Sequence, residues 1–437
     1  MTLSIIVLAA GKGTRMNSEK PKVFHDVGNY PMIFHVLDTA FSLKPSSLNL
    51  VISKDLNHKK KDIEKLYKKI FFSNQIKQLG TADAVKSAFN NKNILGSSTS
   101  LILYGDTPLI TKQTLKKSLL KFKNEDLDIS VLAMRPKDLT SPYGRLDIEK
   151  KKLKRIIEFS EASVDQKKIE LCNSGIMIVK TKLLRKSIEK IRNNNTKSEF
   201  FLTDIVEIMS KDKFRVGFTE CNFYEILGVN DKSDLSLVEN EFQKIQRKKF
   251  LEKGVTLIDP QTVYFSYDTK IGRDVTIFPN VFIGPKVEIG DNVKLKSFSH
   301  IENSRISKNS ETGPFVRTRN DVIIGENVKL GNFVEIKKSK IKKNVKVSHL
   351  SYVGDAEIGD NTNIGAGTIT CNFDGTKKNK TKIEEDCFIG SNSSLIAPIK
   401  IKKRAIIGAG TVIDKDIPEG KTVYRKSELV RKNNKKK

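Results

Sequence analysis

A glycine-rich, basic turn near the N-terminus has the residue types of a phosphate-binding site. The turn reads Gly11-Lys12-Gly13-Thr14-Arg15 and follows a short apolar run from Leu3 to Ala10. Such a run is typical of a buried parallel strand, and two glycines let the backbone bend sharply and approach an anion closely. Lys12, Arg15 and, a little further on, Lys22 add positive charge around the bend. We therefore expect a phosphate cradle at this turn.

Two other glycine motifs that bind phosphate do not fit this stretch. A dinucleotide fingerprint needs a third glycine where Met16 stands, and a Walker loop needs Gly-Lys-Ser/Thr after four spacer residues. An ordinary glycine turn that closes a strand–helix unit is the structural alternative. The basic side chains of Arg15 and Lys22 favour a phosphate role over that alternative.

A carboxylate follows a second buried segment. Residues 100–109 are mostly apolar, and Tyr104-Gly105-Asp106 interrupts them. An aspartate just past a buried strand is a natural Mg²⁺ ligand, because a hard cation prefers carboxylate oxygen. A helix cap or a turn residue is the alternative. Since Asp106 accompanies a phosphate loop, we expect it to bind Mg²⁺.

Strand-like and helix-like segments alternate over the first 230 residues. Apolar runs at 3–10, 48–53 and 100–109 predict strands, and the segments after 32 and after 80 predict helices. This alternation predicts an α/β domain with an open, mostly parallel sheet, in which ligands lie at the carboxyl ends of strands. Residues 231–253 then carry apolar side chains three and four apart, which predicts a connecting helix.

A six-residue repeat begins at Ile271 and continues almost to the end of the chain. Early copies place an aliphatic residue at 271, 277, 283, 289, 295 and 301, and a later copy reads Ile407-Gly-Ala-Gly-Thr411. One aliphatic and one small residue in each six predict a parallel β-helix, in which three sixes form one triangular coil. The insertion 370–381 leaves the repeat, and such excursions usually carry function. The expected domains are therefore 1–230, a linker helix at 231–253, and a β-helix at 254–437 with a basic tail.

Composition limits the partners and the compartment. Lysine and arginine outnumber aspartate and glutamate by 79 to 51, giving a net charge of +28. The lysines are spread along the chain without interleaved aromatic residues, apart from the tail, so we expect anionic substrates rather than nucleic acid. The four cysteines form no metal or redox spacing, which indicates free thiols in a reducing cytoplasm. We expect neither secretion nor a membrane span.

Specific segments in both halves resemble known families. The turn at 11–15, together with 142–145, 172–176 and 228–230, resembles the uridylyltransferase branch of the sugar-phosphate nucleotidyltransferases. The repeats resemble hexapeptide-repeat proteins, whose β-helices wind left-handed and usually trimerise. Gly331 to Lys337, His349 to Asp355 and Asn363 to Gly375 are the most specific stretches of the second half. Over nearly its whole length the chain resembles the bifunctional bacterial N-acetylglucosamine-1-phosphate uridylyltransferase/glucosamine-1-phosphate N-acetyltransferase family.

This resemblance implies two reactions. In the C-terminal half, acetyl-CoA acetylates the amine of glucosamine-1-phosphate. In the N-terminal half, the phosphate of the product attacks the α-phosphorus of UTP, giving UDP-N-acetylglucosamine and pyrophosphate. The product feeds peptidoglycan and lipopolysaccharide synthesis, and the acetyltransferase sites form between neighbouring β-helices of a homotrimer.

The resemblance also assigns residues to the uridylyltransferase site. Gln75, Gly80 and Thr81 would read the uracil, and Tyr104, Gly144, Glu158 and Asn173 would hold the sugar. Asp106 and Asn230 would hold Mg²⁺, while Arg15 and Lys22 would spread the charge of the triphosphate. The remaining substrate contacts would come from Leu8, Ala9, Ala10, Gly11 and Gly105.

The acetyltransferase half needs a base, because an ammonium group cannot attack a thioester. His349 is the best candidate, since an imidazole exchanges its proton near neutral pH; a structural histidine is the alternative. Glu335 is a candidate to orient it. Arg319, Lys337 and Lys378 would bind the sugar phosphate, and Tyr352 and Asn363 the sugar. The acetyl-CoA site would be lined by Ala366, Asn372, Phe373, Ser391, Ala409 and Lys426.

Two other functions are compatible with parts of the sequence. One is a sugar-nucleotide pyrophosphorylase whose β-helix serves only for oligomerisation, which His349 and the insertion at 370–381 disfavour. The other is a nucleic-acid-binding protein, which only the net charge suggests.

Overall fold

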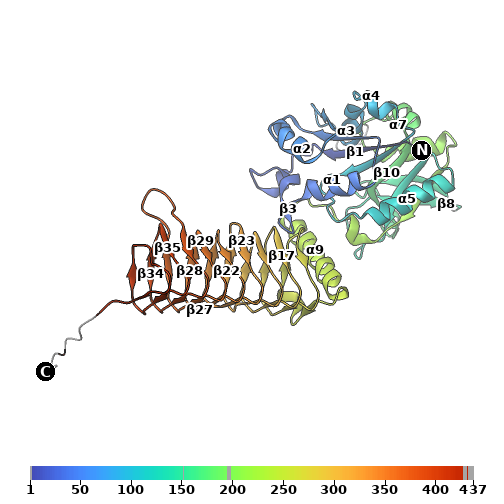
Figure 1. Cartoon of the computed structure of the whole chain (residues 1–437). Coiled ribbons are helices and arrows are strands. Elements are labelled where there is room, and N and C mark those ends of the chain that lie inside the picture. The colour runs from blue at the N-terminus through green and yellow to red at the C-terminus, as the bar shows by residue number, and fades with distance from the viewer. Residues whose placement is uncertain (1, 151, 194–197, 427–430, 432–437) are drawn as a thin grey trace, which may run out of the picture. The chain divides into compact units, whose positions relative to one another are not determined.

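The computed structural model describes residues 2–150, 152–193, 198–426 and 431 (Figure 1). Contacts divide the chain into two compact units, Met1–Phe242 and Gln243–Lys437. The first is an α/β unit and the second a parallel β-helix, as the sequence predicts. All of the basic tail except Arg431 lies outside the described residues.

A seven-strand path forms the centre of the first unit, in the order β11-β7-β10-β6-β1-β4-β5. Strands β5, β4, β1 and β6 are mutually parallel, whereas β10 runs antiparallel to both β6 and β7, so the sheet is mixed. The path consists of β1 (Leu3–Ala9), β4 (Ser47–Ile52), β5 (Ile70–Asn74), β6 (Thr99–Tyr104), β7 (Ile129–Met134), β10 (Cys172–Lys180) and β11 (Val216–Glu220). A hairpin of β8 (Arg145–Glu149) and β9 (Lys152–Ile157) pairs with β10, and β2 (Asp26–Val27) pairs with β3 (Tyr30–Pro31).

Helices cover both faces of this sheet because its central strands are apolar on both sides. Ile5 and Val7 of β1 pack with α1 (Met32–Ser42), α2 (Lys60–Leu66) and α5 (Lys112–Asn124). Ile6 and Leu8 pack on the other face, with α3 (Thr81–Ala88), α4 (Lys92–Leu95), α7 (Thr181–Ile188) and α8 (Asp204–Lys211). The short helix α6 (Val164–Lys167) lies outside these clusters. Continuous apolar strands of this kind are expected where a sheet is buried on both sides.

Helix α9 (Lys232–Glu252) occupies the position of the predicted linker helix. Within the first unit, Glu239 accepts a hydrogen bond of 2.7 Å from the Gly28 backbone. Within the second, Gln243 exchanges two hydrogen bonds with the backbone of Phe265, and Arg247 donates to the carbonyl of Val263. The change from one unit to the other therefore falls inside this helix, and the boundaries predicted at 230 and 254 stay predictions.

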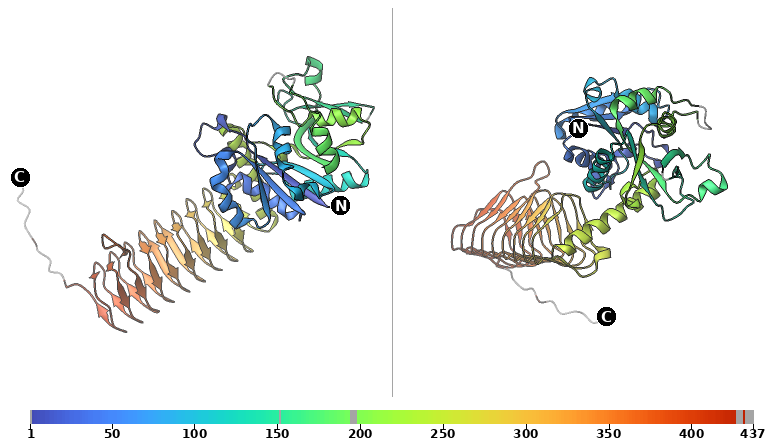
Figure 2. Two further views of the ribbon diagram at one scale, coloured as in Figure 1. Left: turned by 90° about the horizontal axis from the view of Figure 1, so that it is seen from above. Right: turned by 90° about the vertical axis from the view of Figure 1, so that its right-hand side faces the viewer.

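The second unit is built from three parallel sheets whose strands stack coil upon coil (Figure 2). The first contains β12 (Thr256–Leu257), β15 (Thr276–Ile277), β18 (Lys294–Leu295), β21 (Glu311–Thr312), β24 (Lys329–Asn332), β27 (Lys346–His349), β30 (Asn363–Ile364), β33 (Phe388–Ile389), β36 (Ile406–Ile407) and β38 (Thr422–Val423). The second contains β13 (Tyr264–Phe265), β16 (Phe282–Ile283), β19 (His300–Ile301), β22 (Arg317–Arg319), β25 (Glu335–Lys337), β28 (Tyr352–Gly354), β31 (Ile369–Cys371), β34 (Ser394–Ile396) and β37 (Val412–Ile413). The third contains β14 (Lys270–Ile271), β17 (Val287–Ile289), β20 (Ser304–Ile306), β23 (Val322–Ile324), β26 (Lys340–Ile341), β29 (Ala356–Ile358), β32 (Thr381–Ile383) and β35 (Ile399–Ile401).

The six-residue repeat maps directly onto these coils. Its aliphatic residues, such as Ile277, Leu295 and Ile364, fill a single continuous core. Glycines follow them because the next coil passes very close: a Cβ on Gly365 would lie 2.5 Å from the backbone nitrogen of Ser391. The repeat therefore encodes both the apolar interior and the close stacking of the backbone.

Candidate active sites

A cavity of about 490 Å³ opens in the first unit at the carboxyl ends of β1 and β6. It brings together most of the residues predicted for the nucleotide. Its predicted lining residues are Leu8, Ala9, Ala10, Gly11, Arg15, Lys22, Gln75, Gly80, Thr81, Tyr104, Asp106 and Asn230. Gly105 adjoins it, since its backbone nitrogen donates to the Leu8 carbonyl at 2.9 Å.

The two glycines of the phosphate loop have different structural roles. Gly13 has a φ of 64°, and a Cβ there would lie 2.7 Å from the Cβ of Lys22, so the fold itself requires glycine. A Cβ on Gly11 would meet no atom within 4 Å, and its φ lies outside the left-handed region. The fold therefore tolerates a side chain at Gly11, and the free space beside its backbone opens into the cavity.

The predicted metal ligands lie beside the predicted basic residues. Lys22 forms an ion pair with Asp106, and Arg15 donates a hydrogen bond of 3.1 Å to the side-chain oxygen of Asn230. The Val229 backbone nitrogen donates to the Asp106 carbonyl at 3.0 Å, which ties the two ligand-bearing segments together. One carboxylate and one amide oxygen fit Mg²⁺, which usually completes its shell with water and substrate phosphates. Among the described residues, no cluster of three or more His, Cys, Asp or Glu side chains forms a cage for a metal.

The predicted uracil residues form a turn fixed by internal hydrogen bonds. The Gln75 amide donates to the Gly80 carbonyl and to Asp83, both at 2.9 Å. Gly80 has a φ of 113°, and a Cβ there would lie 2.6 Å from the Phe200 carbonyl oxygen. Thr81 begins α3, and its hydroxyl accepts a hydrogen bond from the backbone of Leu202. A distant segment at 200–202 therefore closes over this turn.

The predicted sugar residues gather on adjoining strands, next to the cavity. The Asn173 backbone nitrogen donates to the Gly144 carbonyl at 2.8 Å, and a Cβ on Gly144 would lie 3.7 Å from a Glu158 carboxylate oxygen. Burial raises the pKa of Tyr104, and the carboxylates of Asp106 and Glu158 raise it further. Tyr104 therefore stands between the predicted metal side and the predicted sugar side of the site.

Three polar residues near this site were missed by the sequence analysis. Gln78 lines the cavity and donates to the Ala10 carbonyl at 2.6 Å, and Glu199 also lines it. The Thr203 hydroxyl donates to Glu158 at 2.8 Å. Gln78 adjoins the predicted uracil turn and could have been found there, whereas Glu199 and Thr203 come from a segment without a motif.

Arg145, within the motif 142–145, has a structural role. Its side chain is fully buried and donates to the backbone carbonyls of Leu139, Tyr143 and Lys167. It also contacts the Cys172 sulfur, whose pKa is raised by burial. The guanidinium thereby holds the loop that presents Gly144.

In the β-helix, four predicted residues form one column along a corner. His349, Ala366, Ser391 and Ala409 each immediately precede a residue with a positive φ at this corner. The carbonyls of His349, Ala366 and Ser391 accept hydrogen bonds from Gly367, Asn392 and Gly410 of the following coil. The insertion at 370–381 separates Ala366 from Ser391 in sequence without disturbing the column. The predicted base and three predicted acetyl-CoA residues are thus aligned.

His349 is exposed, and its partner differs from the one expected. The Asn332 side-chain oxygen lies 2.5 Å from Nδ1 of His349, one coil away. Glu335, the expected orienting residue, instead accepts a hydrogen bond of 2.7 Å from Arg319. The reason is geometric: Asn332 and His349 are paired in the register of β24 and β27, whereas Glu335 lies on β25 of the adjacent sheet.

The predicted phosphate-binding cations form a second group. Arg319 and Lys337 are paired in the register of β22 and β25. The adjacent Lys378 ammonium lowers the pKa of Lys337, with further contributions from partial desolvation and from Arg319. Arg319 is paired with Glu335 and Asp355 acts on Lys337, so the three cations outnumber the two carboxylates beside them, an arrangement that suits an anion.

The other predicted acetyltransferase residues are more dispersed. Asn372 lies 3.4 Å from the Tyr352 hydroxyl and donates to Asp355 at 2.6 Å. Asn363 lies on the first sheet of the β-helix, apart from Tyr352 on the second. Phe373 is exposed on the inserted loop, and Lys426 is exposed near the end of the described chain. Asn372 is buried, whereas Asn363, Phe373 and Lys426 are partly or fully exposed, so a single chain does not gather these residues in one pocket.

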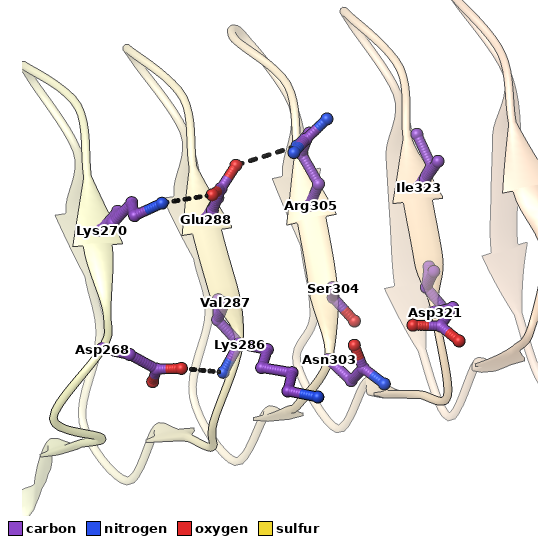
Figure 3. A pocket seen from close by; sticks show the side chains of 11 residues that line it. Asp268, Lys270, Lys286, Val287, Glu288, Asn303, Ser304, Arg305, Asp321 and Ile323 are labelled. Atoms are coloured by element: carbon purple, nitrogen blue, oxygen red, sulfur yellow. Dashed lines mark hydrogen bonds and ion pairs between the residues drawn. The ribbon is translucent and has the colours of Figure 1, made fainter. Parts of the chain in front are cut away.

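A second hollow on the β-helix contains none of the predicted residues. This groove of about 390 Å³ lies along β14, β17, β20 and β23 (Figure 3). Glu288 forms ion pairs with Lys270 and Arg305, and Asp268 accepts from the Lys286 backbone. Glu288 is therefore neutralised by a cation on either side.

Two further properties concern the cysteines and the helices. All four cysteines are unpaired, and Cys172 and Cys387 are buried. Within the described residues, no helix is both long enough and apolar enough to cross a bilayer.

Comparisons with known proteins match the α/β unit and the β-helix to separate families. Residues 5–162 match the MobA-like NTP transferase domain, residues 268–303 the bacterial transferase hexapeptide (six repeats), and residues 380–415 the hexapeptide repeat of succinyl-transferase. The bifunctional protein GlmU of Paramagnetospirillum magneticum is 44% identical over 421 residues, covering 96% of this chain and 92% of that protein. GlmU of Wolbachia pipientis wMel is 41% identical over 434 residues, covering 99% and 98%. The chain belongs to the bifunctional GlmU family.

Membership in the GlmU family confirms the predicted fold, enzyme class and function. The chain is a bifunctional enzyme with a nucleotidyltransferase unit and a hexapeptide acetyltransferase unit, and the two activities together make UDP-N-acetylglucosamine. A β-helix that serves only for oligomerisation is not favoured. The substrates are nucleotides, sugar phosphates and acyl-CoA, and a nucleotidyltransferase of this type depends in general on a divalent metal. Among solved structures, the inositol-1-phosphate CTP transferase from T. maritima is 17% identical with a TM-score of 0.44, covering 56% of this chain and 96% of that chain.

Proposed function

We propose that the cavity at the end of β1 carries out uridylyl transfer with the residues gathered there. The supporting observation is the cavity itself, which is lined by the phosphate loop, the Lys22–Asp106 pair and the uracil turn. A phosphate oxygen of N-acetylglucosamine-1-phosphate forms a bond to the α-phosphorus of UTP. The bond from that phosphorus to the β-phosphate oxygen breaks, and pyrophosphate leaves.

The chain's own groups position the reactants and neutralise charge in this step. Backbone N–H groups of the loop at 11–14 bind phosphate oxygens, and Arg15 and Lys22 offset the negative charge that spreads as pyrophosphate leaves. Gln75, Gly80 and Thr81 bind the uracil, and Leu8, Ala9, Ala10, Gly11 and Gly105 complete the nucleotide contacts. Tyr104, Gly144, Glu158 and Asn173 bind the sugar.

The divalent metal of this site is Mg²⁺ in our proposal. Asp106 and Asn230 would hold it, since their oxygens stand beside the two basic side chains that contact the phosphates. When bound there, the ion would supply positive charge that offsets the charge of the phosphates.

Acetyl transfer takes place, in our proposal, at the corner column of the β-helix. His349 removes a proton from the amine of glucosamine-1-phosphate, and the nitrogen attacks the thioester carbonyl. The new C–N bond forms, the C–S bond breaks, and coenzyme A leaves as a thiol after taking up a proton. Arg319, Lys337 and Lys378 bind the phosphate, and Tyr352 and Asn363 bind the sugar. Ala366, Asn372, Phe373, Ser391, Ala409 and Lys426 bind acetyl-CoA.

The acetyl site would be completed by other copies of the chain in a homotrimer. An exposed apolar ridge supports this: Phe298, Phe315, Phe333 and Leu350 follow one another at the corner that carries His349. The three rings stack with centroids 4.9 Å apart, and all four residues have φ between 49° and 60°. Bulky side chains in the left-handed region are costly, and exposed apolar patches mark interfaces. A second copy covering the ridge would also reach His349.

The substrates suggest the cellular setting. UTP and acetyl-CoA are cytoplasmic metabolites, so we place the enzyme in the cytoplasm, where its product supplies peptidoglycan and lipopolysaccharide precursors. Incubation with UTP, glucosamine-1-phosphate, acetyl-CoA and Mg²⁺ should yield UDP-N-acetylglucosamine, pyrophosphate and free coenzyme A. Omitting acetyl-CoA should prevent nucleotide-sugar formation, and supplying N-acetylglucosamine-1-phosphate should restore it. Formation of the product without acetyl-CoA from glucosamine-1-phosphate would contradict the proposal.

A further inference from the structure

We propose that Asn332 is the positioning residue for His349 in acetyl transfer. Its side-chain oxygen fixes the imidazole as the tautomer protonated on Nδ1 and leaves Nε2 as the proton acceptor. This inference rests on the function proposed above for His349 and adds the residue that makes the imidazole a defined base.

The geometry of the contact carries this inference. The Asn332 side-chain oxygen and His349 Nδ1 are 2.5 Å apart, and the two residues face each other in the register of adjacent parallel strands. The Leu350 backbone nitrogen also donates to the Asn332 carbonyl at 3.0 Å. An amide oxygen only accepts hydrogen bonds, so Nδ1 must carry the proton and the lone pair must lie on Nε2. The side-chain contact therefore orients the ring, while the backbone bond fixes the spacing of the two coils.

A neutral partner suits a base that must start unprotonated. A carboxylate beside an imidazole favours the charged imidazolium, whereas an amide orients the ring without adding negative charge. Among the described residues, the candidate carboxylate Glu335 is paired with Arg319. The charged side chains on the strands beside His349 are Lys329 on β24 and Lys346 on β27, and β30 adds the uncharged Asn363. The hydrogen bond with Asn332 is thus the polar contact that sets the orientation and tautomer of the imidazole.

The Asn332–His349 contact differs from the amide ladder at another corner of the β-helix. There, Asn327 donates to Asn344, and Asn344 donates to Asn361 at 2.8 Å. Those bonds join equivalent side chains of successive coils and stabilise the stack. Asn344 therefore offers a control, because its replacement removes two side-chain bonds between coils at a corner away from His349.

The test uses the full-length variants Asn332→Ala, Asn332→Asp, Asn344→Ala and His349→Ala. Acetyl transfer is measured from pH 5.5 to 9, uridylyl transfer is measured separately, and each variant's molar mass is checked by light scattering. A second readout independent of activity is the rate at which diethyl pyrocarbonate modifies His349, followed across pH by peptide mass spectrometry.

Asn332→Ala should lower kcat for acetyl transfer by roughly 10–100-fold, by analogy with the loss of residues that orient metal-bound histidines. Its KM for glucosamine-1-phosphate should stay within a few-fold, and uridylyl transfer should be unchanged. At alkaline pH, Asn332→Asp should keep more acetyl transfer than Asn332→Ala. The acidic limb of its pH–rate profile should move upward by about 1 pH unit relative to the parent, because the added carboxylate favours imidazolium. The midpoint for modification of His349 should move with it, and Asn344→Ala should change neither.

Three outcomes separate the possibilities. If His349→Ala is inactive in acetyl transfer but Asn332→Ala is within twofold of the parent, the inference fails and the function proposed for His349 stands. If Asn332→Asp leaves both the pH profile and the modification midpoint unmoved, the contact does not control the imidazole and the inference fails. If His349→Ala retains acetyl transfer, the proposed function of His349 itself is wrong.

Discussion

The two units present their predicted active-site residues in opposite ways. In the first, the phosphate loop, the Lys22–Asp106 pair and the uracil turn line one cavity within a single chain. In the β-helix, His349 lies exposed on a corner, while Arg319 and Lys337 stand on the second sheet and Asn363 on the first. The residues predicted for the nucleotide therefore meet in one cavity of a single chain, whereas those predicted for acetyl transfer lie on open faces of the β-helix.

This difference follows from how each fold supplies concave surfaces. An open sheet with helices on both faces creates a crevice at the carboxyl ends of its strands, where loops from several elements converge. A β-helix buries its apolar residues inside its coils and presents the rest on nearly flat faces. Enclosing a substrate on such a face needs a further surface, which another copy of the chain can provide.

Replacing His349 is the sharpest way to separate the two sites. His349→Ala should lower acetyl transfer by roughly 10²–10⁴-fold, the usual contribution of a positioned general base. Uridylyl transfer from supplied N-acetylglucosamine-1-phosphate should persist. Part of the loss should return at high pH, where more of the substrate amine is already neutral. Measuring both half-reactions across pH checks this. If both activities and the proposed trimer weaken together without rescue at high pH, His349 is structural.

Asp106→Ala should produce the reverse pattern. Loss of this carboxylate removes a proposed Mg²⁺ ligand and the partner of Lys22, and should lower uridylyl transfer on the order of 10³-fold. Acetyl transfer should stay near normal. Titrating Mg²⁺ in both assays makes the test specific, because unchanged uridylyl transfer at low Mg²⁺ would contradict the metal role.

These two predictions start from residues that sequence alone could find, for a physical reason. Gly13, Lys22 and Asp106 belong to short segments in which strand, turn and chemistry are adjacent in the chain. The repeat likewise predicted the β-helix, since each coil repeats the same requirement for an aliphatic interior and a small residue. Such patterns can be recognised from sequence because the residues that form the structure are close together in the chain.

Partners across coils or loops were harder to predict. Glu335 is the sequence-based candidate to orient His349, yet the coil repeat of 17 or 18 residues places Asn332 beside His349. That partner could have been derived from the period alone. Thr203 could not, because its contact with Glu158 joins segments 45 residues apart and no motif surrounds it.

The apolar ridge provides a test of the proposal that another copy of the chain completes the acetyl site. Asn280 and Asn392 occupy the same corner with positive φ, so asparagine fits the backbone where Phe315 and Phe333 now stand. The double variant Phe315→Asn/Phe333→Asn should relieve part of the left-handed strain, which costs roughly 1–2 kcal/mol per residue, while weakening self-association. Light scattering should show a smaller assembly, and acetyl transfer at low protein concentration should fall by roughly tenfold or more.

Uridylyl transfer should be retained in this double variant. Ile323→Asn is the control, because it replaces an apolar side chain of similar exposure on another face of the β-helix. A double variant that keeps both its mass and its acetyl transfer would show that the ridge does not complete the site.

The smallest effect we predict probes how enclosed the first site is. Burial raises the pKa of Asp204 to about 6 from an ordinary 3.8, and the nearby carboxylates of Glu158 and Glu161 add to the shift. The folded protein therefore holds this proton more tightly than the unfolded chain. Protonated Asp204 therefore stabilises the folded state, and this contribution is fully present below pH 3.8 and is lost as the pH rises through about 6. Asp204→Asn, which keeps the shape without the charge, should stabilise the protein at pH 7.5 by about 1 kcal/mol, after a discount for partial exposure.

That gain corresponds to a rise in Tm of about 2–4 °C for a unit of this size. At pH 5 it should shrink to about half, because the folded protein is then mostly protonated at Asp204. Differential scanning calorimetry at the two pH values checks this, with Asp165→Asn as a control at a carboxylate that is 90% exposed. A gain of equal size at both pH values would mean that Asp204 is not held in a crowded, partly desolvated site. On the open faces of the β-helix, carboxylates such as Glu288 and Glu335 are paired with cations. Without a crowded Asp204, the first unit would differ from the β-helix only in having a cavity.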